Sequence, residues 1–130
     1  MAINELRFNA IMIKYPGLCA NGFTGGEPFR YSDFADEGGE RAQYERATEF
    51  LQLFTMKAAS FNKHNSSYSL KHMAERYWDF RYGGDSYMSN GVFILAALML
   101  GYNARATARS GPNVFFKIKV WDKFATVPLE

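Results

Sequence analysis

The sequence predicts an α+β domain in which three helices pack against a small antiparallel sheet that ends in a C-terminal β-hairpin. Apolar residues recur at steps of three and four through the middle of the chain. Apolar and charged residues alternate near its end, and glycine and proline separate the two patterns. With 130 residues and 48% hydrophobic content, the chain is long enough to bury a core, and we expect a single domain over residues 1–130.

The first stretch of the chain, residues 4–15, is predicted as a β-strand, with a short helix as the second choice. Phe8, Ala10 and Met12 alternate with mostly polar neighbours, which is the period of a half-buried strand. Residues 16–39 then form an irregular loop that holds six of the 11 glycines. Four aromatic residues in this loop predict that it packs onto the domain. Loops of this length are either functional or surface insertions, and both readings stay open.

Two amphipathic helices are predicted in the middle of the chain. Residues 40–61 place apolar side chains at steps of three and four on one face, and acidic residues lead the helix. A second helix begins near residues 65–67, any of which can cap it, and ends at Gly83 and Gly84. Its apolar and charged residues fall on opposite sides, so both helices are expected to cover a core.

The third predicted helix, residues 91–100, contains the most apolar run in the protein. Ser89 or Asn90 can cap its start, and Gly101 is a natural stop at its end. Because the helix is apolar nearly all round, it is expected to lie in the interior of the domain.

The tail is predicted as a β-hairpin. Residues 103–109 and 114–121 alternate in character, and residues 110–113 between them have the composition of a turn. The alternation in the second strand separates charged residues from a set of apolar residues that is expected to face the core. These apolar residues are Val114, Phe116, Ile118 and Val120.

Charge is distributed unevenly along the chain and suggests a binding surface. Residues 1–56 hold five Lys/Arg and eight Asp/Glu, a net charge of −3, whereas residues 57–130 hold ten and five, a net charge of +5. Cations with an interleaved aromatic residue are typical of surfaces that bind single-stranded nucleic acid. The alternative is a solvated sheet face whose lysines protect an edge strand. The candidate binding residues are Arg105, Arg109, Phe115, Lys117, Lys119 and Lys123.

A second candidate site is the polar patch formed by Lys71, His72 and Glu75 on the second helix. These residues either form a buried network that ties the helix to the hairpin or form a recognition surface. No catalytic motif accompanies them, and the glycine-rich loop lacks the spacing of known phosphate-binding loops. Two histidines and one cysteine do not have the spacing of a zinc site. We therefore predict no catalytic residues, no metal site and no cofactor.

The compartment is predicted to be the cytoplasm. Cys19 is the only cysteine, which fits a reducing environment, and in its glycine-rich loop it is more often inert than reactive. The N-terminus does not have the pattern of a signal peptide, and the longest apolar run, residues 92–100, is too short to cross a bilayer. We predict no membrane partner, and the sequence does not indicate an oligomeric state.

Three segments carry a pattern: S-Y-x-L-K-H-x-x-E at residues 67–75, Y-x-S-N-G-x-F-I-x-A-A at 87–97, and P-N-V at 112–114. In these segments the chain resembles small bacterial proteins that phages, plasmids and other mobile elements carry. The resemblance covers the C-terminal half. It implies a host partner in the host cytoplasm, either a protein or a protein–nucleic-acid complex, and an anti-CRISPR type of inhibitor is one concrete form. It implies no catalytic role.

Three hypotheses about function follow from these observations. The first is a non-enzymatic interaction protein of a phage or mobile element. The second is a direct nucleic-acid-binding protein that uses the basic C-terminal hairpin. The third is a small enzyme centred on Lys71, His72 and Glu75, which would require those side chains to line one cleft.

Overall fold

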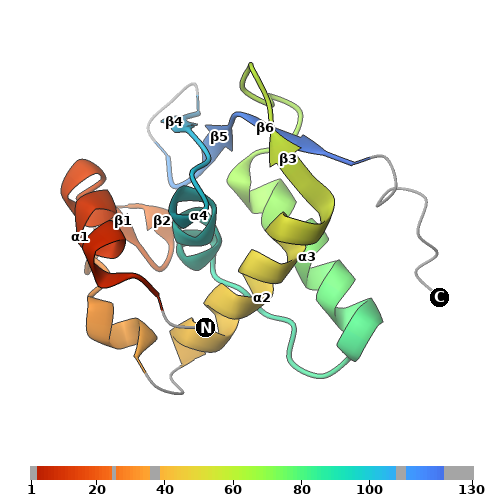
Figure 1. The fold of residues 1–130 in the computed structure, drawn as a ribbon, viewed down its shortest axis with the longest axis horizontal. Coiled ribbons are helices and arrows are strands. Elements are labelled where there is room, and N and C mark those ends of the chain that lie inside the picture. Colours follow the sequence, from red (N-terminus) through yellow and green to blue (C-terminus); the bar gives the residue numbers. More distant parts are fainter. Residues whose placement is uncertain (1–2, 25, 36–38, 108–110, 122–130) are drawn as a thin grey trace.

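The structure is a computed structural model that describes residues 3–24, 26–35, 39–107 and 111–121. In this part of the chain, four α-helices combine with three small two-stranded antiparallel sheets, so the α+β class is confirmed (Figure 1). The number of helices differs from the predicted three because a helix also forms near the N-terminus. The helices are α1 (Glu5–Lys14), α2 (Gly39–Phe54), α3 (Ser67–Tyr82) and α4 (Asn90–Met99).

Helix α4 lies at the centre of the fold. Every residue from Asn90 to Leu98 is buried, as its apolar composition predicts. The first helix and the glycine-rich segment lie on one side of α4, and α2 and α3 lie on the other (Figure 1). The end signals of α3 and α4 are also confirmed. Ser66 and Ser89 cap their first turns, and Gly83 and Gly101 follow their ends with positive φ angles of 73° and 92°.

The prediction of a strand over residues 4–15 is wrong, because this segment forms α1. The Asn4 side chain accepts a hydrogen bond from the Arg7 backbone N–H at 3.0 Å and so caps the helix. Phe8 and Ile11, three residues apart, are the buried residues of α1. The alternation of Phe8, Ala10 and Met12 therefore coincides with a helical spacing that the structure uses instead.

The prediction of one helix over residues 40–61 is also wrong at its C-terminal end. Helix α2 stops at Phe54, and Thr55–Lys57 form strand β3. The Thr55 hydroxyl donates a hydrogen bond to the Leu51 carbonyl at 2.6 Å and lies 2.6 Å from the hydroxyl of Tyr102. The Thr55 side chain thus links the end of α2 to Tyr102, which follows α4. After Thr55 the backbone is extended, and β3 pairs with the C-terminal strand β6.

The C-terminal strand changes its partner halfway along, so the predicted hairpin is only partly present. Strands β4 (Ala104–Ala106) and β5 (Val114–Phe116) pair antiparallel, as predicted. Strand β6 (Ile118–Val120) instead pairs with β3, with Met56 opposite Lys119. The expected alternation is preserved across the break: Val114, Phe116 and Ile118 are buried and Lys119 is exposed. Side-chain periodicity fixes which residues face inward but does not fix the pairing.

The glycine-rich segment packs onto the domain, as predicted. Strands β1 (Leu18–Cys19) and β2 (Gly22–Phe23) form a short hairpin, and a 3-10 helix, η1 (Tyr31–Phe34), follows. The hairpin contacts the start of α4 directly, because the Gly91 N–H donates to the Ala20 carbonyl at 2.9 Å. In the described part of the chain, no helix has the length and apolar character that crossing a membrane requires.

Candidate functional site

The predicted basic surface is only partly within the described residues. Arg105 lies on β4 directly opposite Phe115 on β5, and Lys117 occupies the break between β5 and β6. Arg109 and Lys123 lie outside the described residues. Lys119 lies on β6 and is exposed.

Phe61 is the residue around which these cations gather. The Arg105 guanidinium lies 4.6 Å from the centroid of the Phe61 ring, and the Lys117 ammonium lies 5.2 Å from it. Cations at such distances are attracted by the negative charge on the ring face. Phe61 lies in the loop between β3 and α3, whose backbone is fixed because Asn62 N–H donates to the Phe116 carbonyl at 2.8 Å. The ring and its two cations are therefore held on the sheets.

The loop between β3 and α3 also adds residues to this basic surface, next to the strands. A hollow of about 530 Å³ lies between the loop and strand β6. Its walls include Phe61, Lys63 and His64 from the loop and Lys119 from the strand. We define the basic face as the residues that share this ring or this hollow: Phe61, Lys63, His64, Arg105, Lys117 and Lys119.

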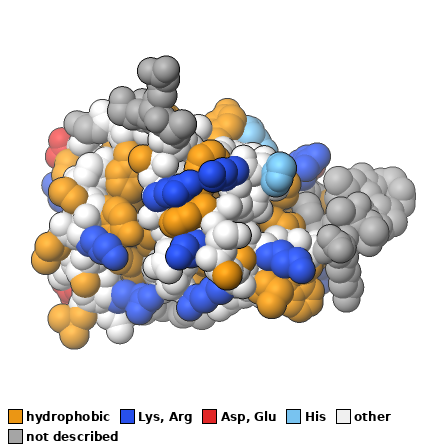
Figure 2. All heavy atoms as spheres, turned by 90° about the horizontal axis from the view of Figure 1, so that it is seen from above, with side chains coloured by type: hydrophobic (Ala, Val, Ile, Leu, Met, Phe, Trp, Pro, Cys, Tyr) orange, Lys and Arg blue, Asp and Glu red, His pale blue; other side chains and the backbone are white. Residues whose placement is uncertain are grey.

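The described segments that build the basic face contain no acidic residues. Residues 50–74 and 86–121, which supply β3 to β6 and the intervening loop, contain no Asp or Glu. Figure 2, which looks onto the end of the molecule where Figure 1 places these strands, shows Lys and Arg side chains with hydrophobic side chains between them. Acidic side chains appear there only at one edge. Phe61 was not among the binding residues predicted from the sequence, and these acid-free segments are the signal that could have indicated it.

The structure brings Lys71, His72 and Glu75 together around one carboxylate. The Lys71 ammonium donates to Glu75 Oε2 at 3.0 Å, and His72 Nδ1 lies 3.0 Å from Glu75 Oε1. Glu75 Oε2 also accepts the Met88 backbone N–H at 2.9 Å. The carboxylate thus ties α3 to the segment before α4, whereas the buried-network interpretation expected a tie to the hairpin.

The three side chains of this patch do not line a common cleft. Lys71 is buried and lines a pocket together with Tyr68 and Tyr87. His72 and Glu75 line a separate hollow, together with other residues of α3. An enzyme centred on the three residues needs them to converge on one substrate, and this geometry gives that hypothesis no support.

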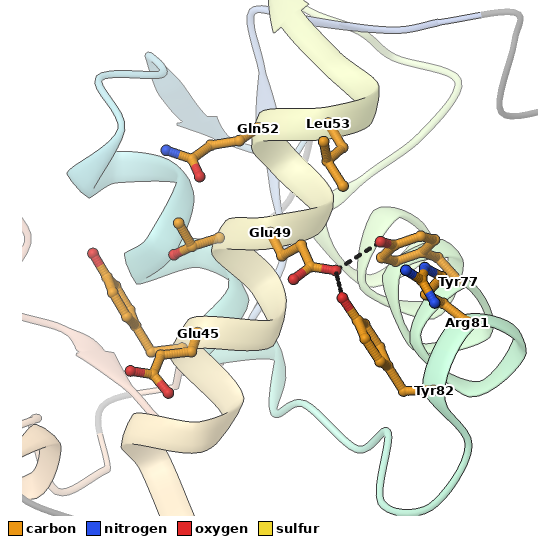
Figure 3. Close-up of a pocket in the computed structure, with 9 residues that line it drawn as sticks. Glu45, Glu49, Gln52, Leu53, Tyr77, Arg81 and Tyr82 are labelled. Atoms are coloured by element: carbon orange, nitrogen blue, oxygen red, sulfur yellow. Dashed lines mark hydrogen bonds between the residues drawn. The ribbon is translucent and has the colours of Figure 1, made fainter. Parts of the chain in front are cut away.

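A second cluster, which was not predicted from the sequence, lies between α2 and α3 (Figure 3). The hydroxyls of Tyr77 and Tyr82 both donate to Glu49 Oε2, at 2.6 and 2.8 Å, beside a cavity of about 490 Å³. Burial and the Glu49 carboxylate raise the pKa of Tyr77 well above its usual range. The phenol therefore stays protonated at neutral pH and serves as a hydrogen-bond donor, and the link joins the two helices.

Cys19 is buried in the β1–β2 hairpin. Its sulfur lies 3.2 Å from the Gly22 carbonyl and 2.9 Å from the Thr24 hydroxyl. Burial acts to raise the pKa of the thiol, but the hydrogen bonds with Thr24 and the neighbouring backbone outweigh it and lower the pKa. Because the sulfur is covered, the structure favours an inert thiol.

Among residues 3–24, 26–35, 39–107 and 111–121, no group of three or more His, Cys, Asp or Glu side chains is arranged to hold a metal ion. The basic face combines positive charge with an aromatic ring that a ligand could approach. No family model, curated protein or solved structure matches the chain, so the function is inferred from the chemistry of these residues.

Proposed function

We propose that this protein is a non-enzymatic binding protein that holds single-stranded nucleic acid on its basic face. The observation that carries the proposal is the Phe61 ring with the Arg105 guanidinium at 4.6 Å and the Lys117 ammonium at 5.2 Å. The planar Arg105 guanidinium offers a surface on which a base can stack, the partly buried Phe61 ring supports it, and the ammonium groups neutralise phosphates.

The arrangement suits a single strand better than a duplex. Duplex recognition usually inserts a helix or a two-stranded ribbon into the major groove. The basic face consists of strands of three residues and one loop, and α4 is buried beneath it. Proteins that bind single strands combine a basic groove with aromatic platforms, and the hollow beside Phe61, with Lys63 and Lys119 in its walls, has this composition.

The resemblance to mobile-element proteins suggests a biological context for this binding. In this context, the bound nucleic acid belongs to a protein–nucleic-acid complex of the host, and the protein inhibits a host defence system in the cytoplasm. The basic face would then contact the exposed nucleic acid of that complex. Support for this context comes from the pattern at residues 67–75, 87–97 and 112–114.

Binding of a fluorescently labelled single-stranded oligo(dT), measured by anisotropy at low salt, tests the proposal. Lys117→Glu and Arg105→Glu are each expected to weaken binding about tenfold or more, because each reverses a charge beside the phosphates. Arg81→Glu is the matched control. Arg81 is exposed in the last turn of α3, and the helix start lies about 20 Å away along its axis.

The control variant is expected to bind within about twofold of the wild type. Circular dichroism shows whether all three variants are folded. Wild-type protein that does not bind the oligonucleotide contradicts the proposal, and so do folded Lys117→Glu and Arg105→Glu variants with unchanged affinity.

A further inference from the structure

The ladder between β3 and β6 continues one residue beyond the end of β6. Within the ladder, Met56 lies opposite Lys119. Past the last residue of β6, the Trp121 backbone N–H donates to the Phe54 carbonyl at 2.9 Å. Hydrogen bonds therefore fix the backbone as far as Trp121, and with it the side of the ladder from which the Trp121 side chain projects.

Met56, Lys119 and Trp121 share the outer face of this ladder. Side chains directly opposite each other in an antiparallel pair lie on one face, and so do residues two apart on one strand. Met56 is 47% exposed, Trp121 is 45% exposed, and Lys119 is exposed as well. The opposite face of the ladder carries the buried side chains of Thr55 and Ile118. The outer face is therefore turned toward solvent.

The Trp121 indole is open to a stacking partner. In the described part of the chain, no other aromatic ring stacks on this indole and no cation lies over it. The Phe61 ring differs, because the cations of Arg105 and Lys117 already lie against it. Proteins that bind single strands stack bases on accessible aromatic rings. Trp121 therefore offers the platform that the half-buried Phe61 ring does not.

Lys119 connects the indole to the basic face. It belongs to the wall of the hollow of about 530 Å³ beside Phe61. It also lies two residues before Trp121, about 7 Å away along the strand. Strands β3 and β6 contain no acidic residue, and the two residues that follow Trp121, Asp122 and Lys123, have opposite charges. Positive charge and an open aromatic ring thus stand side by side, as a polyanion with bases requires.

We infer that Trp121 stacks on an unpaired base of the strand whose phosphate is bound by Lys119, an inference that rests on the proposed function. Every base has a π-face, so this contact adds affinity without selecting a sequence. The flexible thioether of Met56, on the same face, adds apolar contact with the base. The bound strand then runs from the hollow across the outer face of β6 to Trp121.

Fluorescence tests the stacking directly, because the chain contains only two tryptophans, Trp78 and Trp121. In the Trp78→Phe variant the emission comes from Trp121, and saturating oligo(dT) is expected to quench it, since a base stacked on an indole quenches its fluorescence. In the Trp121→Phe variant the reporter is Trp78 on α3, whose ring centroid lies 4.2 Å from that of Tyr82. Its emission is expected to stay unchanged, which makes this variant the matched control.

Affinity provides the second readout. Trp121→Ala is expected to weaken oligo(dT) binding about tenfold, within the range for the loss of one stacked base. The dependence of affinity on salt should keep its slope, because the indole carries no charge and binds no phosphate. Phe80→Ala is the control: Phe80 is a 43% exposed aromatic residue on α3, and its removal should leave the affinity unchanged. Circular dichroism shows whether the variants are folded.

The failure of this inference is distinguishable from the failure of the proposed function. Unchanged affinity of a folded Trp121→Ala variant overturns the stacking role of Trp121, and so does Trp121 emission that saturating oligo(dT) leaves unchanged. If Lys117→Glu still weakens binding in either case, the basic face stands without Trp121. Absence of oligo(dT) binding by the wild-type protein overturns both.

Discussion

Gly91 allows the central helix α4 to pack closely against the β1–β2 hairpin. A Cβ atom at this position would lie 1.7 Å from the Cys19 carbonyl oxygen and 2.7 Å from its carbon. The obstacle is backbone, which cannot rotate away as a side chain can. Only glycine lets α4 approach the β1–β2 hairpin closely enough for the Gly91 N–H to reach the Ala20 carbonyl.

Gly91→Ala is therefore expected to destabilise the protein by about 3 kcal/mol, in the upper range for overpacked sites. Urea unfolding followed by circular dichroism measures the change. Gly39→Ala is the control, because Gly39 begins α2 and a Cβ there would meet nothing within 4 Å. If the two variants are equally stable, the close approach of α4 and the hairpin is wrong.

Residue roles that depend on near neighbours were predictable, and roles that depend on distant ones were not. Ser66 and Ser89 cap helices through a backbone group three residues away, so sequence alone indicates them. Phe61 gains its role from Arg105 and Lys117, which reach it only through the fold. The same holds for Asn90, whose partners lie in the turn before β5.

At the scale of elements, two segments were predicted in the wrong secondary structure because the local pattern of apolar residues is ambiguous in both. The segments at residues 4–15 and 55–57 are short, and each fits both a helical and an extended period. Residues 4–15 form a helix because the Asn4 side chain caps its first turn, a local signal that the sequence contains. Residues 55–57 form a strand because β3 pairs with β6. That pairing depends on where the fold places the C-terminal strand, which the local sequence does not show.

Glu49, Tyr77 and Tyr82 make the link between α2 and α3 sensitive to alkaline pH. Burial and Glu49 raise the pKa of Tyr77 above the ordinary value of 10.0. The folded state therefore keeps the phenol proton at a pH where the unfolded chain releases it. Because the unfolded state then binds fewer protons, the free energy of unfolding falls as pH rises above 10.

In the Tyr77→Phe variant, the free energy of unfolding is expected to fall less steeply as pH rises above 10. At neutral pH the variant should be less stable than the wild type by about 1–2 kcal/mol, because the hydrogen bond to Glu49 is lost. Above pH 10 the gap should narrow, since the variant lacks the group that titrates. Urea unfolding across this pH range measures both. A gap that stays constant with pH would mean that Tyr77 does not titrate as described.

At the scale of the whole molecule, acidic residues are concentrated outside the segments that form the basic face. The acid-free segments 50–74 and 86–121 supply the strands and the loop of the basic face. Glu45 and Glu49 lie on α2 beside the cavity between α2 and α3. The net charge of +2 conceals this separation, which the difference between the two halves of the sequence already indicates. A protein with a local basic surface can bind polyanions despite a small net charge.

The measurement that tests the central claim most directly is the salt dependence of oligo(dT) binding by the wild type and by Lys117→Glu. Binding that neutralises phosphates releases counterions, so the logarithm of the association constant should fall linearly with the logarithm of salt concentration. We expect a steep slope for the wild type and a slope shallower by about 0.7 or more for Lys117→Glu, the value for one lost phosphate contact in a single strand. A wild-type slope near zero, or identical slopes for the two proteins, would contradict nucleic-acid binding through the basic face.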